Sequence, residues 1–134
     1  MKTIEELKKQ EPIFLNNWGS KTDLINDFEE LNYANEEEIQ KATRKYNDIN
    51  ILFASYGTEM YMGEAFVLFE KNKQLFEVNA DHCSCYGLEE QFIPEETTIE
   101  AIKHRLIKGR MGTDEYTGNI YAKELMQFLG IEDE

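Results

Sequence analysis

The spacing of hydrophobic residues changes twice along this chain, and this change constrains the fold more than any other feature of the sequence. Residues 35–46 carry apolar side chains at helical spacing, whereas segments 50–56, 64–70 and 74–79 are rich in aromatic and branched residues and too short for independent helices. Helical spacing returns after residue 97. The sequence therefore predicts a run of strands between two groups of helices.

The polar residues 71–73 connect the second and third of these strands and predict a hairpin. Within the third strand, Phe76 and Val78 are expected on one face and Leu75 on the other, because successive side chains alternate. We predict an α+β fold with a small antiparallel sheet of about three strands, arranged as a meander or hairpin. About four to five helices pack with this sheet and cover one face, with N-terminal helices before the strands and C-terminal helices after them.

Capping residues predict where the helices begin. Candidate caps stand before the helical segments at four positions: Thr3 with Glu6, Ser20, Asn35, and Thr97 with Glu100. A last helix is expected from near Asn119 to Leu129, where Gly130 ends it. Local chemistry alone therefore predicts where these helices start and where the last one ends.

The length and composition predict one domain that spans residues 1–134. Of these 134 residues 41% are hydrophobic, which is enough to bury most of the surface that an unfolded chain of this size exposes. No apolar run approaches the roughly 20 residues that cross a bilayer, and the charged N-terminus has no apolar signal-peptide region. We expect a soluble, cytoplasmic protein with no membrane contact.

The chain is strongly acidic, with a formal net charge of −13 from 27 acidic and 14 basic residues. This balance argues against sequence-independent binding to nucleic acid, because such binding neutralises phosphates with lysine and arginine. It favours a partner with a basic surface, or mimicry of a polyanion. The most acidic run, Glu36, Glu37 and Glu38, is a candidate contact surface. It also occupies the first turn of a predicted helix, where carboxylates stabilise the positive end of the dipole, so both interpretations stay open.

The segment HCSC holds both cysteines of the chain, Cys83 and Cys85, next to His82. Metal binding by these residues needs a further ligand, and strand geometry would point His82 away from the two thiols. A reactive thiol needs a neighbouring cation or imidazole, which His82 or His104 could supply, but no feature of the sequence requires such a thiol. We expect a structural role, with reduced thiols, the strand end beneath the C-terminal helices and His82 held by a local hydrogen bond.

The segment KHRLIKGR gathers cationic residues in this acidic chain. They are Lys103, Arg105, Lys108 and Arg110, with His104 among them. One interpretation is that cations near the end of a helix complement the negative end of its dipole. The alternatives are an anion-binding site formed with the amides of residues 109–112, or a surface through which copies of the chain form a homo-oligomer.

The segment GTEMYMG, residues 57–63, lies between the first two strands and carries Tyr61 and two methionines, and it forms either a wide turn or an extension of both strands. In either case its large apolar side chains are expected to be exposed, and exposed apolar side chains that lie together are a candidate contact surface for a protein partner. Tyr61 is therefore a candidate binding residue.

Residues 50–106, and above all the blocks AFVLFE and HCSCYGLE, resemble a family of small, uncharacterised proteins encoded by phages and prophages. The resemblance implies a setting in the cytoplasm of a host cell and carries over no catalytic residue. Small acidic phage proteins often act by binding and disabling a host protein, so the resemblance favours a host partner.

We therefore expect a non-enzymatic, acidic accessory protein that needs no cofactor and binds a host macromolecule, as a counter-defence factor or a polyanion mimic. One alternative is a metal-binding or thiol-dependent module at His82, Cys83 and Cys85. The other is a binder of a small anionic ligand at the basic residues 103–112.

Overall fold

The computed structural model describes residues 1–83 and 86–131 and confirms the α+β class. Within these residues the main sheet has five strands, in the order β1-β2-β3-β4-β5. The strands are β1 (Ile13–Asn16), β2 (Asn50–Glu59), β3 (Met62–Lys71), β4 (Gln74–His82) and β5 (Glu95–Thr97). The helices of the described chain are α1 (Ile4–Lys9), α2 (Lys21–Glu29), the 3-10 helix η1 (Leu31–Tyr33), α3 (Glu36–Lys45), α4 (Ile99–Lys108) and α5 (Ala122–Leu129). A separate hairpin consists of β6 (Thr113–Asp114) and β7 (Asn119–Ile120).

The predicted antiparallel meander forms the centre of the sheet, where β3 pairs with β2 on one side and β4 on the other. The prediction of about three strands is too small, because two short strands extend the sheet at its edges. β1 pairs in parallel with β2, which makes the sheet mixed, and β5 pairs antiparallel with β4. Four residues in β1 and three in β5 are too few to show a strand period, so their sequence did not reveal them.

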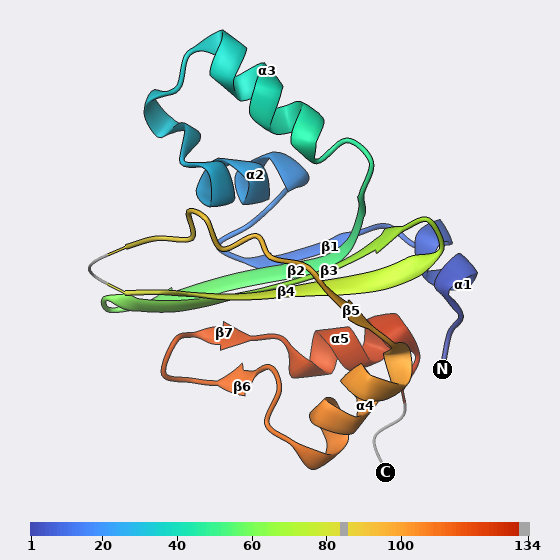
Figure 1. Cartoon of the computed structure of the whole chain (residues 1–134). Coiled ribbons are helices and arrows are strands. Elements are labelled where there is room, and N and C mark those ends of the chain that lie inside the picture. The colour runs from blue at the N-terminus through green and yellow to red at the C-terminus, as the bar shows by residue number, and fades with distance from the viewer. Residues whose placement is uncertain (84–85, 132–134) are drawn as a thin grey trace.

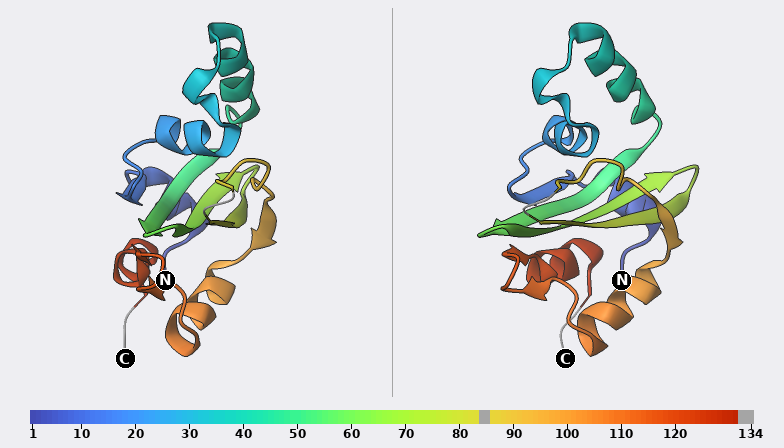
Figure 2. Two further views of the ribbon diagram at one scale, coloured as in Figure 1. Left: turned by 90° about the vertical axis from the view of Figure 1, so that its left-hand side faces the viewer. Right: turned by 60° about the vertical axis from the view of Figure 1, so that its left-hand side comes forward.

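Both faces of the sheet are covered, which corrects the prediction of one covered face (Figure 1). Helices α2 and α3 lie over the face that is upper in Figure 1, and α4, α5 and the β6–β7 hairpin lie under the lower face, as Figure 2 also shows. Along β3, Val67 and Phe69 belong to the upper core, whereas Phe66 and Leu68 belong to the lower core. The continuous apolar run of β3 is explained by burial on both faces.

The predicted alternation along β4 is confirmed. Phe76 and Val78 pack in the upper core, and Leu75 packs in the lower core. The same alternation sends Glu77 and Asn79 to the lower face, where their backbone partners on β3 are Leu68 and Phe66. Polar side chains therefore reach the lower layer just beyond its apolar core.

Side-chain capping explains where four of the described helices start. The side chains of Thr3, Ser20 and Asn35 accept backbone hydrogen bonds at the starts of α1, α2 and α3, as predicted. At α4 the cap is Thr98, which accepts from the Ala101 amide, while Thr97 ends β5. The last helix starts at Ala122, because Asn119 belongs to β7. Among the described helices, none combines the length and the hydrophobicity that crossing a membrane requires.

Polar contacts and close backbone packing hold the β6–β7 hairpin against the lower face. Asn119 of β7 is fully buried, and its Oδ1 accepts hydrogen bonds from Ser55 Oγ (2.6 Å) and Asn16 Nδ2 (3.3 Å). A Cβ atom at Gly57 of β2 would lie 2.4 Å from the Asn119 backbone nitrogen, so glycine is required for this approach. The hairpin and the segment before it therefore lie under the strands and form one wall of a cleft.

Candidate functional site

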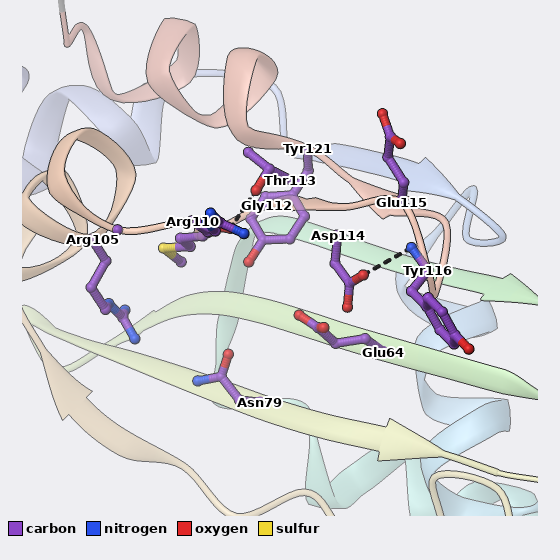
Figure 3. A pocket seen from close by; sticks show the side chains of 12 residues that line it. Glu64, Asn79, Arg105, Arg110, Gly112, Thr113, Asp114, Glu115, Tyr116 and Tyr121 are labelled. Atoms are coloured by element: carbon purple, nitrogen blue, oxygen red, sulfur yellow. Dashed lines mark hydrogen bonds between the residues drawn. The ribbon is translucent and has the colours of Figure 1, made fainter.

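A polar cleft of about 760 Å³ opens between the lower face of the sheet and the segment that joins α4 to α5 (Figure 3). The sheet contributes one side chain from β3 and one from β4, and the connecting segment contributes the opposite wall. The lining residues are Glu64, Asn79, Arg105, Gly109, Arg110, Met111, Gly112, Thr113, Asp114, Glu115, Tyr116 and Tyr121. They are brought together from separate segments of the chain between Glu64 and Tyr121.

Gly112 determines how the connecting segment turns at this wall. Its φ is +73°, and its carbonyl oxygen accepts hydrogen bonds from the amides of Tyr121 (2.9 Å) and Ala122 (3.1 Å). A Cβ atom at this position would lie 2.7 Å from the Ala122 nitrogen. Glycine is the residue that adopts this conformation without strain, so Gly112 ties the wall to the start of α5.

Tyr121 lies at the centre of the cleft. Its ring stacks on Phe66 of β3, with 5.0 Å between centroids and 6° between planes, and its hydroxyl points into the cleft. Burial raises the pKa of Tyr121 far above its ordinary value, and the nearby Glu64 carboxylate raises it further. The hydroxyl therefore keeps its proton and is a hydrogen-bond donor at any physiological pH.

The basic side of the cleft is formed by Arg105 and Arg110. Arg105 Nη2 donates a 2.5 Å hydrogen bond to Glu77 Oε2, and Asn79 Nδ2 donates to Glu77 Oε1 (2.7 Å). Burial alone would raise the pKa of Glu77, but the hydrogen bonds from Arg105, Thr97 and Asn79 outweigh it and hold this pKa below its ordinary value. Arg105 is thus oriented by an ionised carboxylate.

Arg110 differs from Arg105 in its surroundings. It is exposed, and in residues 1–83 and 86–131 no carboxylate lies within ion-pair distance of its guanidinium group. Its charge is therefore not neutralised by a side chain of the described protein.

The acidic side of the cleft is formed by Glu64 and Asp114, which lie across Tyr121 from the two arginines in Figure 3. Asp114 Oδ1 accepts a hydrogen bond from the Tyr116 amide (2.9 Å). Glu64 is half-buried, and no described residue donates a hydrogen bond to its carboxylate. Burial raises the pKa of Glu64, and the charges of Asp114 and Asp81 raise it further.

The structure separates the four basic residues predicted as one site. Arg105 and Arg110 line the cleft, whereas Lys103 and Lys108 do not. Arg105 and Lys108 also lie in the last turn of α4, where their charges complement the helix dipole. Sequence reasoning missed Glu64, Asp114 and Tyr121 as site residues, because nothing in their local sequence distinguishes them from strand, loop or core residues.

The acidic run lies far from this cleft. Glu36, Glu37 and Glu38 are exposed in the first turn of α3, over the opposite face of the sheet (Figure 1). The Asn35 side chain accepts from the Glu38 amide (2.9 Å), and the Glu38 carboxylate accepts from the Asn35 amide (3.3 Å). These contacts form a capping box, so at least Glu38 has a structural role.

Tyr61 lies in the β2–β3 turn and is 73% exposed. Met60 and Met62 beside it are exposed, as is Tyr116 of the β6–β7 connection. Together with Glu59 and Glu115 these four residues line a shallow groove, which we call the hairpin-end groove. Because Tyr116 also lines the cleft, the groove continues from the acidic side of the cleft.

The described residues on either side of Cys85, 82–83 and 86–92, lie on the side of α2 and α3, which corrects for these residues the expected position beneath the C-terminal helices. The backbone of Cys83 pairs with Tyr86 (3.2 and 3.4 Å), and Leu88 and Phe92 enter the upper core. The expected local hydrogen bond of His82 is also wrong, since Nδ1 is buried and has no partner among the described residues. The ring instead contacts Tyr56 edge-on, with 6.4 Å between centroids.

The metal-binding alternative involves Cys85, which lies outside the described residues. Among residues 1–83 and 86–131, no group of three or more histidine, cysteine, aspartate or glutamate side chains is arranged to hold a metal ion. His82 and Cys83 alone do not complete a zinc site, which uses four protein ligands or three with a water.

The fold and the cleft define the class of this molecule as an α+β protein with a mixed sheet and a ligand-sized polar cavity. Comparisons of the chain with protein-family models, curated proteins and solved structures find no match. The chemistry of the cleft is therefore what indicates a function.

Proposed function

We propose that this protein binds, in the cleft, a small molecule that carries an anionic group such as a phosphate or carboxylate. The observation that supports the proposal is that the guanidinium groups of Arg105 and Arg110 and the hydroxyl of Tyr121 line one cavity of about 760 Å³. Ligand pockets are commonly about 300–1,000 Å³ and orient the ligand with a few polar groups. Arginine suits an anionic ligand because its planar set of donors matches carboxylate and phosphate oxygens.

The three groups have different roles in such a site. Arg105 is oriented by Glu77 before any ligand arrives, and only one of its donors is used in the 2.5 Å hydrogen bond. Tyr121 supplies a neutral donor that stays protonated. Arg110 supplies the charge that no carboxylate of the described chain neutralises. The proposal needs no catalytic step and extends the interpretation of residues 103–112 as an anion site.

The test is an NMR titration of isotopically labelled protein with inorganic phosphate and with alkyl phosphates. Arg110→Gln removes a cation from the cleft, and Lys108→Gln is the matched control because Lys108 is exposed and does not line the cleft. We expect saturable shifts at residues 110–116. Arg110→Gln should lower the affinity for phosphate about tenfold or more, since a hydrogen bond to a charged group contributes about 1.5–3 kcal/mol. Lys108→Gln should change the affinity little. Equal weakening in both variants, or no saturable binding of inorganic phosphate or of any alkyl phosphate, would reject the proposal.

A second function, binding to a host protein, is supported by the hairpin-end groove. Tyr61 and Tyr116 are 73% and 75% exposed, and Glu59 and Glu115 border them. Exposed apolar side chains with an acidic border suit a partner that presents an apolar segment flanked by lysine or arginine. The net charge of −13 would then speed association with a basic surface.

This second function is tested by capture of partners from host lysate at increasing salt. We expect capture to weaken with added salt and to be lost in Tyr61→Ser combined with Tyr116→Ser, while the melting temperature is retained because both side chains are exposed. Analytical ultracentrifugation of the purified chain distinguishes a host partner from a homo-oligomer. Capture that survives the double substitution would exclude the groove as the contact.

A further inference from the structure

We infer that the ligand of the cleft is zwitterionic, with an ammonium group in addition to its anionic group. The inference rests on the proposed anion-binding function and concerns the other side of the same cavity. There, Glu64 and Asp114 face the cleft across Tyr121 from Arg105 and Arg110 (Figure 3). The cleft thus presents cations on one side and carboxylates on the other, and a ligand that uses both sides carries both charges.

The surroundings of Glu64 indicate a missing cation. Its carboxylate is half-buried on β3 and has Asp81 and Asp114 as charged neighbours, both of the same sign. In the part of the chain that the structure describes, no lysine, arginine or histidine lies within ion-pair distance of it. A half-buried carboxylate without a partner is unfavourable in the free protein, and an ammonium group would supply the partner.

Asp114 is oriented to contribute to the same contact. Its Oδ1 accepts from the Tyr116 amide in the β6–β7 connection, and its Oδ2 has no hydrogen bond within the described chain. An ammonium group has three donors, which suits a site with two carboxylates and the Asn79 side-chain carbonyl at the edge of the cleft.

The charge balance of the cleft excludes a simple anion as the best ligand. The Arg105 charge is largely offset by Glu77, so Arg110 remains against the carboxylates of Glu64 and Asp114. Glu115 also lines the cleft, but its side chain points away from these two carboxylates in Figure 3. A phosphate without an amine would contact Arg110 but would also face two groups of its own sign in the same cavity. A molecule with a phosphate or carboxylate at one end and a primary amine at the other meets complementary charge at both ends.

The test uses matched pairs of ligands that differ only in the amine. Calorimetric titrations compare phosphoethanolamine with ethyl phosphate, and longer aminoalkyl phosphates with their alkyl counterparts, because the spacing between the charges is a variable of the ligand. We expect at least one amine to bind about tenfold more tightly than its amine-free partner. Glu64→Gln and Asp114→Asn should each reduce this ratio, whereas Glu11→Gln, an exposed carboxylate outside the cleft, should leave it unchanged.

The outcomes separate the two proposals. Equal binding within every matched pair, with sensitivity to Arg110→Gln, would overturn the zwitterion inference and leave the anion site intact. Preference for the amine that is unchanged in both Glu64→Gln and Asp114→Asn would also overturn it. Tight binding of an alkyl phosphate only when Mg²⁺ is added would replace the ammonium with a bridging cation and overturn it as well. No binding by any member of the series would reject the anion site itself.

Discussion

Arg105 of α4 donates a 2.5 Å hydrogen bond to Glu77 of β4, whose residue surface is only 6% exposed. This contact joins the C-terminal layer to the sheet and orients one guanidinium group at the cleft. A buried carboxylate is costly without a partner, so the pair has a structural role as well as a role in the proposed site.

Replacing Arg105 with leucine should lower the free energy of unfolding by about 1–3 kcal/mol, because Glu77 would remain buried without its cation. Replacing both residues, as Arg105→Leu with Glu77→Leu, should recover part of this loss, since no charge is then left unpaired. Urea unfolding of the two single variants and the double variant measures the coupling. Additive effects of the two single substitutions would show that the hydrogen bond contributes little.

Glu64 should make stability fall as pH rises above about 4.5. Its pKa in the folded protein is raised from the ordinary value of 4.5, so the unfolded chain loses this proton first, and the stabilising contribution of protonated Glu64 is lost as the pH rises through the raised pKa. Glu64→Gln should therefore be more stable than the unmodified protein at about pH 7, with the difference shrinking towards about pH 4. Urea unfolding across this range is the measurement, with Glu11→Gln as control. A constant difference at all pH values would contradict the raised pKa.

Gly112→Ala should destabilise the protein by about 1–2 kcal/mol or more and abolish ligand binding in the cleft. Its φ of +73° is unfavourable for alanine, and the added Cβ would lie 2.7 Å from the Ala122 nitrogen. Gly19→Ala is the control, because a Cβ there meets its nearest atom at 3.5 Å, an ordinary contact. Thermal unfolding and the phosphate titration measure both effects. Normal binding by Gly112→Ala would show that the wall of the cleft does not depend on this turn.

Reversing Glu36, Glu37 and Glu38 to lysine should lower the free energy of unfolding, because each substitution places a cation at the positive end of the α3 dipole. Each reversal should cost about 0.3–1 kcal/mol. The change at Glu38 also removes the capping box with Asn35. Ligand affinity in the cleft should not change, since α3 lies over the opposite face of the sheet. Asn35→Ala is a useful comparison, because it removes the cap at a cost of about 1 kcal/mol without changing charge. If the triple variant, corrected for folded fraction, loses a host partner that Asn35→Ala retains, the acidic run is a contact surface after all.

The sequence by itself determined the features that depend on neighbours along the chain. Hydroxyl and amide side chains at Thr3, Ser20 and Asn35 satisfy backbone amides within three residues, so the helix starts could be located before the structure was known. The meander of β2, β3 and β4 could also be predicted, because its strands are long and consecutive and a short polar connection, Asn72 and Lys73 in the structure, joins the last two. Alternation placed Phe76, Val78 and Leu75 on their correct faces.

Only the tertiary structure decided the edge strands, the second covered face and the cleft. The parallel pairing of β1 with β2 spans about 40 residues, and nothing in the four residues of β1 specifies it. From the sequence, Glu64 is predicted only as a strand residue and Tyr121 only as an aromatic residue of the core. They belong to one site because Phe66 stacks on Tyr121 under the sheet. Arg105 acquires its orientation from Glu77, 28 residues away. Such contacts arise when the C-terminal layer packs on the sheet. Sequence patterns depend on neighbours along the chain, so they do not predict which surfaces will pack against each other.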